Sequence, residues 1–133
     1  MASKKICYGD NVEVEGHKLA LSLAVRAGET VYVSGVASFD KETFKPEIDC
    51  GIAEQTDNCM QLIKMFLEMA GSNLEEVVKL NVTLKNREDL DGYNETIRKY
   101  FPENPPARIT TLGDFLLAGA LIEVDAIAYS PQD

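Results

Sequence analysis

Two charged residues that lie within apolar runs, Arg108 and Glu123, are the clearest candidates for chemistry in this chain. Arg108 opens one apolar segment, and Glu123, fifteen residues later, lies in the middle of the next. Arginine can bind a carboxylate through two parallel hydrogen bonds. A glutamate can take up a proton and return it. The pair therefore predicts a cleft that binds a small carboxylate-bearing substrate and moves a proton on it.

A structural interpretation competes with this one for both residues. Structural ion pairs outnumber catalytic ones, so Arg108 could be a surface or interface arginine. An unpaired buried carboxylate is costly, so Glu123 could be the salt-bridge partner of Arg108. The two roles are compatible, and both remain open at this point.

The composition narrows the class of protein. The 133 residues, 45% apolar and 26% charged, predict one globular domain spanning 1–133. The net charge of −9 argues against nucleic acid as a partner. The three cysteines and the single histidine lack metal-ligand spacing, so we expect no metal site. We read no signal peptide and no membrane span, and therefore expect a cytoplasmic protein.

The first half of the chain contains the segments that would form the start of a sheet and one helix. Short strands are expected over 12–14 and 19–25, and the β-branched run 30–36 predicts a buried strand. Apolar residues then recur with a helical period over 51–70, and Gly71 is placed to end that helix.

The second half adds a strand over 77–84, a second helix and two final strands. Asn86 and Asp89 resemble a helix N-cap arrangement. The order β-β-β-α-β-α-β-β predicts an α+β fold, in which two helices cover one face of a mixed sheet. The second helix is expected to bury Leu90, Tyr93, Ile97 and Phe101.

The last strand, 121–128, predicts which sheet face each residue occupies. Successive side chains point to opposite faces, so Glu123 and Asp125 should lie away from the helices. That second face is half apolar and half acidic and needs a cover, which suggests a subunit interface. The helix-covered face is expected to hold Ile122, Val124, Ala126 and Ala128.

Several motifs, in order along the whole chain, match one known family. They are Ala27-Gly28 leading to Tyr32-Val33-Ser34-Gly35, Asn94 six residues before Tyr100-Phe101, and Pro106-Ala107-Arg108 ahead of Ile122-Glu123-Val124-Asp125-Ala126-Ile127-Ala128. By these motifs the chain resembles the RidA family, the reactive-intermediate deaminases also called YjgF. The resemblance implies a chorismate-mutase-like α+β fold. It also implies a homotrimer with a central barrel and a ligand cleft between each pair of subunits.

The resemblance further implies an activity without a cofactor, the hydrolysis of reactive enamines and imines. Substrates would be small 2-imino acids, and the products 2-oxo acids and ammonia. Arg108 would bind the substrate carboxylate, and Glu123 would deprotonate the attacking water. The remaining cleft residues would be Ser34, Gly35, Asn94 and Thr110. Each of these four also has a purely structural interpretation as a strand or helix-edge residue.

The chain departs from the family pattern on one wall of the cleft. Ala20 and Leu21 stand where many deaminating members have a Pro-Tyr pair, so Leu21 would line the cleft without a hydroxyl group. Val36 replaces a common glutamine, and Thr110 a common cysteine. The cleft is therefore expected to be unusually apolar. This favours, as an alternative function, a non-catalytic sensor or regulator that binds a small carboxylate. RNA cleavage is disfavoured by the acidic charge and the lack of a histidine pair.

Overall fold

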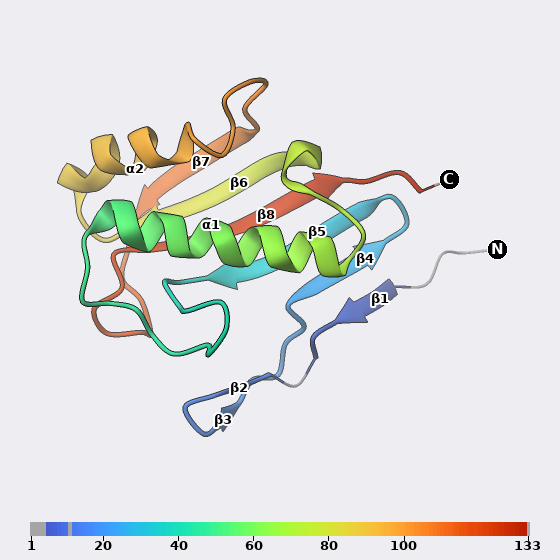
Figure 1. Cartoon of the computed structure of the whole chain (residues 1–133), viewed down its shortest axis with the longest axis horizontal. Coiled ribbons are helices and arrows are strands. Elements are labelled where there is room, and N and C mark those ends of the chain that lie inside the picture. The colour runs from blue at the N-terminus through green and yellow to red at the C-terminus, as the bar shows by residue number, and fades with distance from the viewer. Residues whose placement is uncertain (1–4, 11, 133) are drawn as a thin grey trace.

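A twisted sheet with both helices on one side forms the frame of the protein (Figure 1). The computed structural model describes residues 5–10 and 12–132. Neither of the helices in these residues is long and apolar enough to cross a membrane. The helices are α1 (Ile52–Met69) and α2 (Leu90–Ile97). The sheet order is β1 (Lys5–Tyr8), β4 (Ala24–Ala27), β5 (Thr30–Val36), β8 (Ile122–Tyr129), β6 (Val77–Leu84) and β7 (Ala107–Leu112).

The sheet is mixed, as predicted, and its one parallel pair is β6 with edge strand β7. The chain leaves β6, forms α2, and returns to run beside β6 in the same direction, which is what a helical crossover imposes. All the other paired strands of this sheet are antiparallel. Short 3-10 turns over Leu74–Glu76 and Arg87–Asp89 precede β6 and α2.

The predicted order of elements is confirmed for the six-stranded sheet, but its first strand is β1 rather than residues 12–14. Those residues contribute instead to a small separate hairpin of β2 (Glu13–Val14) and β3 (His17–Lys18). The expected strand over 19–25 is wrong for residues 19–23, because β4 begins only at Ala24 and runs to Ala27. The alternating leucines of this segment, Leu19, Leu21 and Leu23, line a cavity.

The core lies between the helices and the sheet face beneath them. Helix α1 buries Cys59, Ile63, Phe66 and Leu67. Its last residue is Met69, and Gly71, just past the C-cap residue Ala70, has a φ of 79° that suits a glycine. Helix α2 buries Tyr93 and Ile97, and Phe101 after it is buried as predicted. The expectation that Leu90 is buried is wrong, since 38% of it is exposed. The 3-10 turn before α2 makes Leu90 the first residue of that helix.

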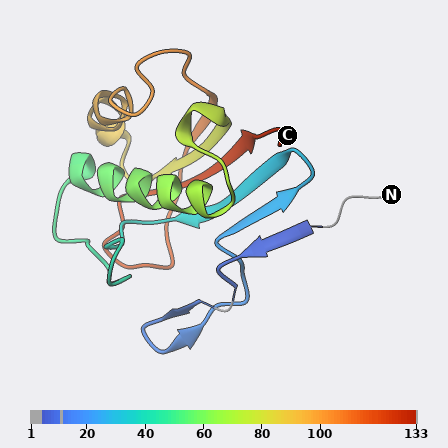
Figure 2. The same cartoon turned by 45° about the vertical axis from the view of Figure 1, so that its right-hand side comes forward.

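Strand β8 confirms the predicted alternation of faces. Its helix-side residues are at most 1% exposed, and Glu123 and Asp125 lie on the opposite face. Both views show the helices on the same side of the sheet (Figures 1 and 2). We call the side without helices the bare face, and it carries Tyr32, Asn81, Ile109, Glu123, Asp125 and Ile127.

Candidate functional site

Arg108 lies on the helix side of β7 and faces α2. Its register partner on β6 is Leu80, a residue buried beneath the helices. Its Nη1 donates a 2.7 Å hydrogen bond to Oδ1 of Asn94, and its guanidinium carbon lies 5.2 Å from the centroid of the Tyr93 ring. A cation over an aromatic face is attracted by the ring electrons. Arg108 is therefore held on two sides by neighbouring residues of α2.

The charge of Arg108 is not neutralised within the described residues, because no carboxylate oxygen lies within 4.0 Å of it there. A guanidinium has five N–H donors, so Arg108 keeps donors for an anionic ligand. It borders an open cleft of about 450 Å³. The cleft is lined by Leu80, Tyr93, Asn94, Ile97, Arg98, Phe101, Pro105, Pro106 and Arg108.

Tyr93 and Thr110 complete the surroundings of Arg108. Burial raises the pKa of the Tyr93 phenol, and the nearby charge of Arg108 acts in the opposite direction. Thr110 lies on the same side of β7 as Arg108, opposite Val82, and its hydroxyl is buried without a hydrogen-bond partner among the described residues. Thr110 does not line the open cleft itself.

Glu123 lies on the bare face of β8, directly against Gly35 of β5. A Cβ atom at position 35 would lie 2.9 Å from Oε1 of Glu123, so the absence of a side chain there lets the carboxylate approach the strand. Loss of surrounding water raises the pKa of Glu123 above its ordinary 4.5, and the negative charge of Asp125 raises it further. Glu123 is thus a carboxylate that takes up a proton more readily than an ordinary one.

A second cavity, of about 400 Å³, has Glu123 in its wall. Ser34 also lines it, but its hydroxyl already donates a 2.6 Å hydrogen bond to the backbone oxygen of Ser22. Most of the remaining walls are aliphatic or aromatic. The cavity is lined by Val12, Val14, Glu15, His17, Leu19, Leu21, Leu23, Ser34, Gly35, Val36, Ala37, Phe39, Phe44, Leu62, Phe66, Leu116, Leu117 and Glu123.

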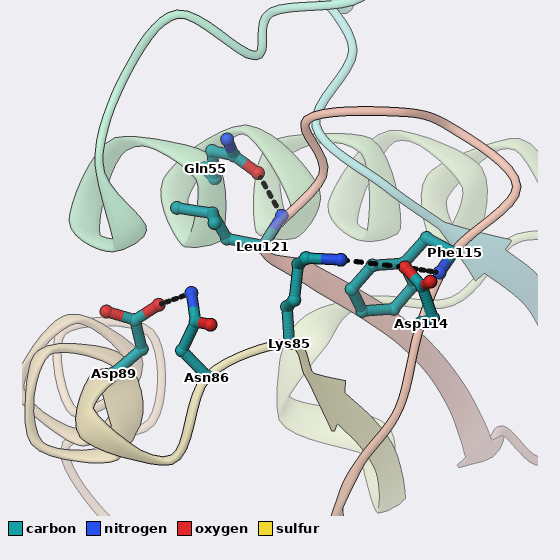
Figure 3. Close-up of polar contacts among 7 residues, drawn as sticks. All are labelled: Gln55, Lys85, Asn86, Asp89, Asp114, Phe115 and Leu121. Carbon is teal, nitrogen blue, oxygen red and sulfur yellow. Dashed lines mark hydrogen bonds and ion pairs between the residues drawn. The ribbon is translucent and has the colours of Figure 1, made fainter.

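The loop between β7 and β8 forms part of this second cavity and leads into Glu123. Near its end, the buried Gln55 of α1 accepts a 2.8 Å hydrogen bond from the backbone N–H of Leu121 (Figure 3). Near its start, Lys85 forms a 2.9 Å ion pair with Asp114, which also accepts the N–H of Phe115 (Figure 3). The chain is thus fastened on both sides of the two leucines that line the cavity, Leu116 and Leu117.

The predicted site residues fall into two groups that do not meet within one chain. Arg108 pairs with Leu80 of β6, and Glu123 pairs with Thr83 across the other edge of β6. Their Cα atoms are therefore two strands apart across the sheet and three residues apart along it, or about 14 Å at ordinary sheet dimensions. Asn94 and Thr110 lie with Arg108, whereas Leu21, Ser34 and Gly35 lie with Glu123.

This separation rules out, within one chain, the structural interpretation of Glu123 as the salt-bridge partner of Arg108. Arg108 and Glu123 form no ion pair with each other in a single chain, and their side chains point to opposite faces of the sheet. The glutamate therefore does not neutralise the arginine as a neighbour within the same subunit.

Sequence reasoning missed most of the residues that line these cavities, among them Arg98 and His17. Arg98 adds a second cation to the Arg108 cleft, and its position four residues after Asn94 places both on one side of α2. The four-residue spacing of Asn94 and Arg98 in the sequence could therefore have indicated that Arg98 lines the same cleft. His17 lines the second cavity from the β2–β3 hairpin, and no pattern in its sequence neighbourhood indicated this. Among the described residues, no group of three or more His, Cys, Asp or Glu side chains could hold a metal ion.

Comparison with known proteins shows the family to which this chain belongs. A family model described as endoribonuclease L-PSP matches residues 17–130. The chain belongs to this family, which includes RidA. A RutC family protein of Pyrococcus abyssi is 41% identical over 109 residues, which cover 81% of this chain and 84% of that protein. The human 2-iminobutanoate/2-iminopropanoate deaminase is 32% identical over 107 residues, 80% of this chain and 77% of the human protein.

Solved structures of the RidA family share the fold. The crystal structure of RidA from the Antarctic bacterium Psychrobacter sp. PAMC 21119 matches with a TM-score of 0.77 and 33% identity. The match covers 91% of this chain and 94% of that one. The α+β fold expected from the motifs is thereby confirmed.

Proposed function

We propose that this protein is a cofactor-independent imine/enamine deaminase that hydrolyses small 2-imino acids to 2-oxo acids and ammonia. The observation that carries the proposal is Arg108, a cation held by Asn94 and Tyr93 in a cleft and lacking an acidic partner among the described residues. Such a group suits a substrate carboxylate. Membership of a family that includes a 2-iminobutanoate/2-iminopropanoate deaminase supports the reaction type.

In the proposed reaction Arg108 binds the carboxylate of the imino acid, and Glu123 acts as the general base. Glu123 takes a proton from water while the water oxygen attacks the imine carbon. The same proton is then delivered to the nitrogen, which gives a carbinolamine. Glu123 next moves the hydroxyl proton of the carbinolamine to that nitrogen, so the carbon–nitrogen bond breaks as the carbonyl forms, and ammonia and the 2-oxo acid leave. A carboxylate with a raised pKa is suited to both accepting and returning the proton.

The two groups can act on one substrate only if they come from different copies of the chain. The carboxylate of a 2-imino acid is bonded directly to its imine carbon. The Cα atoms of Arg108 and Glu123, in contrast, are about 14 Å apart, and their side chains lie on opposite faces of the sheet. We therefore propose a cleft between subunits of a homotrimer, with Arg108, Asn94 and Thr110 from one subunit. Glu123, Ser34, Gly35 and Leu21 would come from its neighbour.

The experiment that tests this function measures 2-oxo acid and ammonia release from a 2-imino acid generated in situ by an amino-acid oxidase. We expect the wild type to accelerate release, and Arg108→Ala to lower kcat/KM by about 100-fold, because a charge-assisted hydrogen-bond pair is lost. Arg87→Ala is the matched control, since Arg87 is exposed and lies outside the cleft. A wild-type rate no greater than that of Arg108→Ala would overturn the proposal.

A second candidate function is a non-catalytic sensor of small carboxylates, and the observation that favours it is the apolar side chain of Leu21. Its side chain offers no hydroxyl to substrate or water beside Glu123. Tight binding of a 2-oxo acid, without turnover of any imine in a panel, would favour this function over hydrolysis.

A further inference from the structure

We infer that the cavity beside Glu123 binds a large apolar side chain of the substrate, of the size found in leucine or phenylalanine. The preferred ligands would then be 2-imino acids, and the corresponding 2-oxo acids, with branched aliphatic or benzyl side chains. This inference rests on the proposed function, because it identifies the substrate class of the same site.

The walls of the cavity are its first argument. Leucines at positions 19, 21 and 23 reach it from the segment before β4, and Phe39 and Phe44 reach it from the loop after β5. The hydroxyl of Ser34 is already bonded to the backbone oxygen of Ser22. Apart from Glu15, His17 and Glu123, the described residues of the wall offer no other charged or free polar side chain, so a polar or charged substrate side chain would lose its water without gaining a partner on most of the wall.

The position of Glu123 is the second argument. The carbon attacked by water carries three groups, namely the imine nitrogen, the carboxylate and the side chain. In the proposed cleft the carboxylate points to the Arg108 of a neighbouring subunit, and the nitrogen must receive its proton from Glu123. The side chain is left to occupy the cavity that has Glu123 in its wall.

The size of the cavity is the third argument. About 400 Å³ lies within the range of sites that bind whole small molecules. A methyl side chain would leave most of that space unfilled, whereas an isobutyl or benzyl group would contact several walls. One methylene group in an apolar pocket changes selectivity by roughly 10- to 200-fold. The leucine-derived imine should therefore be preferred over the alanine-derived imine by at least about tenfold.

The test compares kcat/KM for imines generated from alanine, leucine and phenylalanine, with semicarbazide present to trap free imine. We expect the leucine- or phenylalanine-derived imine to exceed the alanine-derived imine by at least about tenfold. Leu21→Ser should reduce that ratio by about tenfold, because it places a hydroxyl in the apolar wall. Leu90→Ser is the matched control: both leucines are 38% exposed, but Leu90 lies outside the cavity.

A binding measurement separates this inference from the proposed function and needs no variant. Calorimetry compares 4-methyl-2-oxopentanoate with pyruvate on the wild-type protein, and we expect the larger acid to bind at least about tenfold more tightly. Hydrolysis with the alanine-derived imine preferred would overturn the inference and keep the proposed function. Tighter binding of the larger acid without any hydrolysis would overturn the proposed function and keep the inference that the cavity binds a large apolar side chain. Neither hydrolysis nor a binding preference would overturn both.

Discussion

The proton affinity of Glu123 depends on its surroundings, so its proposed role can be tested directly through the pH dependence of the reaction. Its pKa is raised by the loss of water around it and by the charge of Asp125. Asp125 is held in place by a 2.7 Å hydrogen bond from Nδ2 of Asn81 on β6. The folded chain therefore holds the Glu123 proton more tightly than the unfolded chain does. Ionised Glu123 consequently lowers the stability of the fold as pH rises through the raised pKa.

The pH dependence of hydrolysis should reveal this raised pKa. In the proposed mechanism Glu123 is the base and must be ionised, so kcat/KM should fall as pH decreases, with its midpoint above 4.5. Asp125→Asn removes the neighbouring negative charge and should move that midpoint to lower pH. Asp91→Asn is the control, since Asp91 is exposed on α2 and lines neither cavity. Rates corrected for uncatalysed hydrolysis provide the measurement. An unchanged midpoint in Asp125→Asn would contradict the assigned role of Asp125.

At the scale of elements, the buried Arg26 of β4 joins three parts of the fold. Only 2% of this residue is exposed. Its Nη2 donates to the backbone oxygen of Ala70 at 2.8 Å, where α1 ends, and its Nη1 donates to the backbone oxygen of Ser130 at 2.7 Å, after β8. The hydroxyl of Ser130 in turn donates to Oε1 of Glu76 at 2.9 Å. Arg26 therefore satisfies carbonyl groups at the ends of two elements.

Replacement of Arg26 should therefore destabilise the whole domain. Arg26→Met keeps much of the volume but leaves the carbonyl oxygens of Ala70 and Ser130 without a donor. We expect the free energy of unfolding to fall by about 3 kcal/mol, since each buried unsatisfied group costs on the order of 1–3 kcal/mol. Urea denaturation gives the measurement. The exposed Arg87, changed to Met, should alter stability by less than about 0.5 kcal/mol. A loss below about 1 kcal/mol in Arg26→Met would show that water replaces the guanidinium.

The elements also show what the sequence could predict. Helix α1 was predicted from its helical apolar period, strands β5 and β6 mainly from their β-branched residues, and β8 from its alternating faces. The alternating leucines over 19–23 led to a wrong strand prediction, because side chains that line a cavity can have the same spacing as those of a half-buried strand. The residues of the candidate site could be named from their motifs, but their separation could not. It depends on β6 lying between β7 and β8, a pairing that no local pattern encodes.

At the scale of the whole molecule, the bare face and the divided site have one explanation. Tyr32 is 48% exposed and Ile109 is 51% exposed on the bare face, and the described part of the chain provides no helix to cover them. A second copy could cover this apolar surface. The same association could bring the Glu123 of one subunit to the Arg108 of another. Oligomerisation would then be required for catalysis as well as for stability.

Mixing of two inactive variants tests this explanation directly. Arg108→Gln retains Glu123, and Glu123→Gln retains Arg108, so each alone should lose about 100-fold or more in kcat/KM. In randomly mixed trimers about one quarter of the clefts would combine the two intact residues, and activity should return to about that fraction of wild type. Light scattering should show three times the 14.7 kDa of one chain for every sample.

Co-refolding Arg108→Gln with the Arg108→Gln/Glu123→Gln double variant supplies the control for this mixing experiment. Mixed trimers of these two contain no intact Arg108, so their activity should stay at the level of the parents. If Arg108 and Glu123 instead acted within one chain, no mixture of the single variants could exceed the mean of its parents. Recovery in the first mixture but not in the control would therefore assign the arginine and the glutamate of each cleft to different subunits, because neither variant contains both groups.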